Sequence, residues 1–161
     1  MRQGDKATVL LIDDELVNIK ILSDILKGEY EVIFATSGEE GVHRAVESLP
    51  DIILLDVMMP GMDGYAVCSR LQQDTRTAGI PVVYVTALGS TAQEVKGLNT
   101  GAIDYITKPI RALPLLARIK AHLALKNAQD LLRNQNHQLE EEISQRTHEL
   151  ELVKDVSLHA L

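Results

Sequence analysis

Polar side chains directly follow several short apolar runs of this 161-residue sequence. Asp13 and Asp14 follow TVLLI, and Asp56 follows IILL. Thr86 follows PVVYV, and Lys108 closes the segment DYITK. The carboxyl ends of parallel strands meet at one edge of an open sheet, where such folds bind ligands. If these runs are parallel strands, three acids, a hydroxyl and an ammonium group meet at that edge.

This set of side chains is suited to metal-assisted chemistry on a phosphoryl group. Crowded carboxylates repel one another, so either one of them takes up a proton or a cation binds. Oxygen ligands favour Mg²⁺, which accepts one or two carboxylates together with waters and phosphate oxygens. We therefore expect a Mg²⁺ site made by the three acids, with the backbone carbonyl of Met58 as a further ligand. Asp56 is then the candidate nucleophile toward phosphorus, with Lys108 and Thr86 stabilising charge on the phosphoryl oxygens.

The elements that would position these residues alternate along the chain. The expected strands are Thr8–Ile12, Glu31–Ala35, Ile52–Leu55, Pro81–Val85 and Tyr105–Ile106. Helical periodicity is found at 15–26, 38–49, 65–73, 91–99 and from Arg111 onward. Ser37 is a candidate N-cap, with Glu40 three residues later. Nearly continuous apolar strands that alternate with helices predict an α/β fold with a doubly wound, five-stranded parallel sheet.

Composition excludes several classes of protein. The net charge is −7 and no segment carries a basic run, so direct binding to nucleic acid is not expected. Cys68 is the single cysteine, which excludes an internal disulfide and favours a reducing cytoplasm. The N-terminus does not read as a signal peptide, and no apolar run reaches the roughly 20 residues of a membrane span. We expect the five histidines to lie on solvated helix faces: His43, His122, His137, His148 and His159.

The last part of the sequence, residues 126–161, carries no strand signal and reads as one helix that continues from the fifth helix of the sheet domain. Its apolar residues follow the a/d rhythm of a coiled coil, with Asn136 at an a position and Arg146 interrupting one d position. We expect a parallel dimer stalk; the alternative is a solvated helix with scattered leucines. The stalk positions are Leu132, Asn136, Leu139, Ile143, Leu150 and Val153.

Over about residues 7–125 the chain resembles the receiver domain of two-component response regulators. The resemblance rests on the acidic pair Asp13-Asp14, the segment LLDVMMPGMDG around Asp56, Thr86 in VTA, and Lys108 in DYITKP. It implies a flavodoxin-like (βα)₅ fold in which a sensor histidine kinase transfers a phosphoryl group to Asp56. It also implies that Asp14 binds Mg²⁺ directly and Asp13 mainly through water.

The same resemblance implies a conformational switch. Lys108 would pair with the phosphoryl group, and the bond between Lys108 and Pro109 would be cis. Thr86 would move toward the phosphoryl group while Tyr105 turns inward. The altered surface would then be read by partners, so the receiver itself is expected to be a phosphoacceptor and not an enzyme.

The segment LEEEISQRTHELE…KDVSLHAL resembles the linker of receivers fused to HD-GYP domains, which hydrolyse cyclic di-GMP. This resemblance implies an N-terminal fragment, with a receiver at 1–125 and a helical linker at 126–161 leading to an output domain. Linkers of receiver–diguanylate cyclase and receiver–kinase fusions are similar. Residues 1–161 contain neither an HD pair nor a GGDEF-like motif.

Two other functions are compatible with parts of the sequence. A Mg²⁺-dependent phosphatase that forms an aspartyl phosphate usually carries a second acid two residues beyond the nucleophile, and that position here is Met58. A phosphorylation-independent dimerisation scaffold would not need the complete set of acids. Single residues also have structural alternatives: Asp13 could only cap the next helix, and Tyr105 could be plain core.

Overall fold

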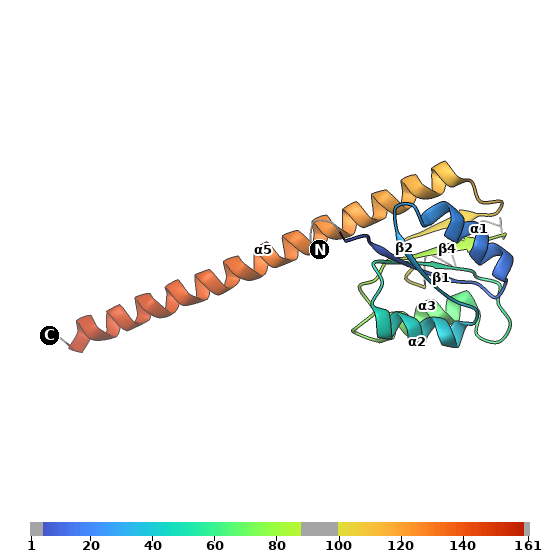
Figure 1. Ribbon diagram of the computed structural model, residues 1–161. Coiled ribbons are helices and arrows are strands. Elements are labelled where there is room, and N and C mark those ends of the chain that lie inside the picture. The colour runs from blue at the N-terminus through green and yellow to red at the C-terminus, as the bar shows by residue number, and fades with distance from the viewer. Residues whose placement is uncertain (1–4, 88–99, 160–161) are drawn as a thin grey trace. The chain divides into compact units, whose positions relative to one another are not determined.

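The computed structural model describes residues 5–87 and 100–159, with side chains as far as Lys154. Five parallel strands form one sheet in the order β2-β1-β3-β4-β5 (Figure 1). The strands are β1 Thr8–Ile12, β2 Glu31–Ala35, β3 Ile52–Leu55, β4 Val82–Thr86 and β5 Asp104–Thr107. The strand order reverses direction between β1 and β3, which makes the sheet doubly wound. The predicted flavodoxin-like sheet is therefore confirmed.

The described helices are α1 Leu16–Leu26, α2 Gly38–Ser48, α3 Gly64–Gln73 and α5 Ala112–His159. The helix predicted at 91–99 lies outside the described residues. The chain separates into two compact units, Met1–Leu123 and Ala124–Leu161, and each is described by itself. Within the described part of the chain, no helix has both the length and the hydropathy that a membrane span requires.

Successive residues of β1 and β3 point to opposite faces of the sheet, and helices cover both faces. Leu10 and Leu55 pack with α2 and α3 on one face. Leu11 and Leu54 pack on the other face with α1 and with Leu115 at the start of α5. Figure 1 shows α1 and the pair α2–α3 on opposite sides of the strands. This two-sided burial explains why β1 and β3 read as continuous apolar runs.

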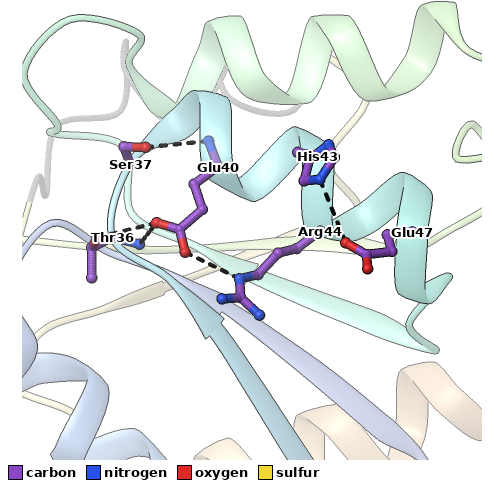
Figure 2. A network of polar contacts seen from close by, with 6 residues as sticks. All are labelled: Thr36, Ser37, Glu40, His43, Arg44 and Glu47. Carbon is purple, nitrogen blue, oxygen red and sulfur yellow. Dashed lines mark hydrogen bonds and ion pairs between the residues drawn. The ribbon is translucent and has the colours of Figure 1, made fainter.

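The N-terminus of α2 is held by a polar network, shown in Figure 2. The Ser37 hydroxyl accepts a hydrogen bond from the Glu40 amide at 3.2 Å, as predicted for an N-cap. The Glu40 carboxylate accepts hydrogen bonds from the amide and hydroxyl of Thr36 and from Arg44. These donors, the Thr36 amide first, lower the pKa of Glu40. The network therefore fixes the loop between β2 and α2 with Glu40 ionised.

Candidate functional site

Asp13 and Asp56 are neighbours because their strands are paired in register. Ile12 of β1 is the register partner of Leu55 of β3, so each acid is the next residue along its strand. The Asp56 amide donates a hydrogen bond to the Ile12 carbonyl at 2.9 Å. One carboxylate oxygen from each of Asp13, Asp14 and Asp56 lies within 4.8 Å of the others. The predicted meeting of three acids at the sheet edge is thus present in the structure.

Asp13 has two contacts, one to each carboxylate oxygen. Its Oδ1 accepts a hydrogen bond from the Glu15 amide at 2.9 Å, just before α1. Its Oδ2 lies 3.4 Å from the Nζ of Lys108. The N-cap of α1 is Glu15, which has no side-chain cap hydrogen bond, so Asp13 holds the turn before the helix and is not the helix cap that the sequence offered as an alternative. The residue is 3% exposed, so its charge depends on these partners.

Lys108 reaches the acids from the end of β5. Its amide donates to the Thr86 carbonyl at 2.8 Å, which ties it to the end of β4. Its Nζ lies 3.4 Å from Asp13 and 3.7 Å from Asp56. The Lys108–Pro109 peptide bond is cis. Lys108 therefore places one positive charge between two nearly buried carboxylates.

A tight turn follows Asp56 and depends on Gly64. The Met58 amide donates to Asp56 Oδ1 at 3.2 Å, and the Gly64 amide donates to the Val57 carbonyl at 2.9 Å. A Cβ added to Gly64 would lie 2.4 Å from the Asp56 carbonyl oxygen. No side chain fits at that distance, so only glycine allows α3 to begin against the backbone of the acid. The role of the Met58 carbonyl as a metal ligand stays a prediction.

The electrostatics of the site favour a cation. Burial raises the pKa of Asp56 to about 6, and the charges of Asp13 and Asp14 raise it as well. The Lys108 ammonium and the Met58 amide act in the opposite direction but only partly compensate. When all three acids are ionised, one lysine leaves an excess of negative charge beside the buried carboxylates of Asp13 and Asp56. A divalent cation with oxygen ligands would neutralise that excess, so the residues fit Mg²⁺.

Thr86 and Tyr105 lie on adjacent strands near this edge. Thr86 is buried at the end of β4, in register with Thr107 of β5. Tyr105 is half-buried against the core, and its carbonyl accepts a hydrogen bond from Arg118 at 2.9 Å. Their predicted action as a switch stays a prediction.

One prediction about histidine is wrong. His122 does not lie on a solvated face, because its side chain is 19% exposed and its Nε2 lies 2.9 Å from Asp104 Oδ2. Arg118 also approaches Asp104, at 3.6 Å. The sequence offered a usable signal: Arg118 and His122 are four residues apart, on one face of α5, and Asp104 begins the adjacent strand. This cluster ties β5 to α5.

The six predicted stalk positions all lie on α5. The five apolar residues among them are each between 54% and 66% exposed. Their exposure in a single chain leaves the dimer stalk a prediction. They are Leu132, Leu139, Ile143, Leu150 and Val153.

Comparison with known proteins agrees with this site. The profile of the response regulator receiver domain matches residues 9–120. The chain is 45% identical over 128 residues to the response regulator PleD of Caulobacter vibrioides, a match that covers 79% of this chain and 28% of PleD. It is 35% identical over 162 residues to a probable cyclic di-GMP phosphodiesterase of Vibrio cholerae, covering 100% of this chain and 36% of the relative. The chain thus spans about a third of the length of these relatives.

A solved structure supports the same assignment. The crystal structure of a CheY-like response regulator receiver domain protein from Methanospirillum hungatei superposes with a TM-score of 0.72 at 28% identity, covering 78% of this chain and 99% of that one. Receiver domains are phosphoacceptors that sensor histidine kinases phosphorylate, they bind Mg²⁺ at an acidic pocket, and they are generally not catalysts. The match does not favour the phosphatase or the scaffold. This chain therefore belongs to the receiver domain family of two-component response regulators.

Proposed function

We propose that Asp56 is the residue that accepts the phosphoryl group, from a phosphohistidine of a sensor histidine kinase. The observation that carries this assignment is the position of its carboxylate. Asp56 Oδ2 lies 3.7 Å from the Lys108 ammonium, and Asp13 and Asp14 each place an oxygen within 4.8 Å of an Asp56 oxygen. Asp56 thus contacts the lysine, lies close to the other two carboxylates and directly follows the central strand β3.

The chain's own residues divide the work of the transfer. An Asp56 carboxylate oxygen bonds to phosphorus as the phosphorus–nitrogen bond breaks, and the nitrogen keeps the bonding pair. Lys108 binds the incoming phosphoryl oxygens, and the Thr86 hydroxyl donates a hydrogen bond to one of them. Asp14 would hold Mg²⁺ directly and Asp13 mainly through water, with Asp56 and the Met58 carbonyl completing the protein ligands. When bound, Mg²⁺ supplies positive charge to the phosphoryl oxygens.

A conformational change would follow the transfer. Movement of Thr86 toward the phosphoryl group would vacate space beside β4, and Tyr105 would turn inward to fill it. The half-buried position of Tyr105 on the adjacent strand supports this coupling. Partners would read the altered surface of β5 and α5.

Intact-protein mass spectrometry tests the phosphoacceptor. The chain is incubated with acetyl phosphate and Mg²⁺, and we expect a mass gain of one phosphoryl group that Asp56→Asn abolishes. Asp24→Asn is the matched control, because Asp24 is a 55% exposed carboxylate of α1 that pairs with Lys27, the residue that follows the helix. A gain that persists in Asp56→Asn, or no gain in the unaltered chain, would exclude the assignment.

We also propose a role for residues 126–161, as a helical linker that dimerises the chain and leads from a receiver at 1–125 to an output domain. The exposed apolar positions of α5 support dimerisation. The full-length match to a probable cyclic di-GMP phosphodiesterase, of which this chain spans 36%, supports that class of output. The reading frame beyond the codon for Leu161 tests it: an HD-GYP domain is expected, and another type of domain would exclude it. We place the protein in the cytoplasm, where the buried thiol of Cys68 stays reduced.

A further inference from the structure

The unit Ala124–Leu161 carries an apolar seam along one side of its helix. Leu125 extends the predicted stalk positions by one heptad and is 55% exposed. Leu125, Leu132, Leu139 and Val153 take d positions, and Ile143 and Leu150 take a positions. A groove on this helix is lined by Gln129, Leu132, Arg133, Asn136, His137 and Glu140. Such a seam on one helix needs a partner helix.

We propose that a second copy of this chain covers the seam, as a parallel and in-register coiled coil that Asn136 and the flanking charges specify. This inference rests on the proposed parallel dimer and adds its alignment and the residues that specify it. Leucine at d together with isoleucine and asparagine at a is the pattern that favours two parallel strands.

Asn136 sets the alignment. In the in-register parallel pair, Asn136 of one copy faces Asn136 of the other, and each amide can donate to and accept from its counterpart. An antiparallel pair instead sets a positions against d positions. Four of its alignments place the Asn136 amide opposite an apolar residue, where a buried amide loses its hydrogen bonds. These residues are Leu125, Leu132, Leu139 and Val153.

The charges that flank the seam decide against the remaining antiparallel alignment, which sets Asn136 against Arg146. That alignment brings Glu142 opposite Glu142, Glu140 opposite Glu140, and Lys126 opposite Lys154. Like charges in these positions are unfavourable. The parallel alignment instead sets Glu149 of one copy beside Lys154 of the other and brings no like-charged pair together at the flanking positions.

Arg146 makes one layer of the parallel pair weak. It is the one charged residue at the a and d positions from 125 to 153. The structure pairs it with Glu142 of its own chain at 3.1 Å, which leaves the guanidinium partly neutralised at the edge of the seam. Two arginines that face each other across the seam oppose association, so the layer reduces the affinity without changing the alignment.

Disulfide cross-linking tests the orientation on the whole chain. The variants Leu132→Cys and Leu150→Cys are first oxidised separately. They are then mixed and oxidised, with one of the two proteins carrying a mass tag so that a mixed dimer can be told from a self-linked one. In the parallel pair each variant cross-links to itself. In the antiparallel pair residue 132 of one copy faces residue 150 of the other, so only the mixture cross-links. Leu131→Cys is the matched control, because Leu131 is 59% exposed like Leu132 at 60% but lies off the seam.

We expect self-linked dimers from both seam variants and none from Leu131→Cys or from the unaltered chain, whose Cys68 is buried. Cross-links found only in the mixture would overturn the orientation while leaving the dimer. A monomeric mass in solution, with and without acetyl phosphate, would overturn dimer and orientation together. The mass gain at Asp56 is read separately, so the phosphoacceptor assignment stands or falls on its own.

A second measurement tests the weak layer. Arg146→Leu should lower the dimer dissociation constant at least tenfold in sedimentation experiments. His148→Leu adds the same side chain at an exposed position off the seam and should leave the dissociation constant unchanged. Equal effects of the two substitutions would show that Arg146 does not lie in the seam and would overturn the proposed alignment.

Discussion

The Lys108 ammonium lies 3.7 Å from a carboxylate oxygen of Asp56, so residues that follow two different strands of the sheet share one charge contact. The Lys108 side chain is 22% exposed and that of Asp56 is 7% exposed, so water screens this pair only partly. The Lys108 ammonium thereby offsets part of the repulsion between the carboxylates of Asp13 and Asp56.

Replacing Lys108 by methionine should slow phosphoryl uptake from acetyl phosphate by about 10²-fold, because one preorganised positive charge is lost from the phosphoryl site. Lys108→Arg keeps the charge and should retain more of the rate. Time courses of the mass gain measure both. Equal rates for Lys108→Met and the unaltered chain would show that the contact with Asp56 has no role in transfer.

Asp56→Asn should stabilise the chain in the absence of Mg²⁺ at pH 8. The pKa of Asp56 is raised from 3.8 to about 6 on folding, so its contribution to stability is present below about pH 4 and is lost as the pH rises through 6. The neutral amide avoids that loss, and we expect a gain of about 1–3 kcal/mol in the free energy of unfolding. Denaturant titrations give the difference in the free energy of unfolding between Asp56→Asn and the unaltered chain, and this difference should be smaller at pH 4 than at pH 8. A larger difference at pH 4 than at pH 8 would contradict the raised pKa of Asp56.

The affinity for Mg²⁺ should fall as the pH drops through about 6, because protonation removes the negative charge of Asp56. Calorimetric titrations between pH 5 and pH 8 measure this dependence. In Asp56→Asn the affinity should be lower at pH 8 and should vary less over that range. An unaltered chain whose affinity stays constant from pH 5 to pH 8 would argue that Asp56 is not a ligand.

Gly64→Ala should destabilise the fold by about 2–4 kcal/mol, because the new Cβ would lie 2.4 Å from the Asp56 carbonyl oxygen and must displace backbone. It should also slow phosphoryl uptake, since the displaced backbone carries the acid. Gly28→Ala is the control: nothing lies within 4 Å of its added Cβ, so stability should change little. Thermal unfolding of the two variants gives the comparison, and similar losses would contradict the role of close approach.

Much of the fold could be predicted from the sequence because a strand that is buried on both faces appears as a continuous run of apolar residues. The residues of β3 are all buried, and the run IILL shows this directly. The strand β5 at the edge is only half-buried, so its apolar signal was two residues long although the strand has four. The meeting of the acids followed from the rule that ligands bind at the carboxyl ends of parallel strands.

Other features depended on partners distant in the chain. His122 looks like any helical histidine until Asp104 is placed beside it. Glu40 lies three residues after the N-cap Ser37, and its carboxylate reaches the Thr36 amide, because the path of the loop before α2 decides which amide is within reach. The sequence pattern describes how a residue is placed on its own helix or strand. Contacts of this kind depend on how two elements meet, so the pattern does not predict them.

The pairing of Ile12 with Leu55 has a consequence for how this protein can vary. A shift of one residue between β1 and β3 would turn every side chain of the moved strand to the opposite face. It would also move the two acids apart along the strands by about 3.3 Å. The same register therefore sets both the packing of the core and the distance between Asp13 and Asp56. A substitution in β1 or β3 that shifted this register would disturb the core and the acidic site together.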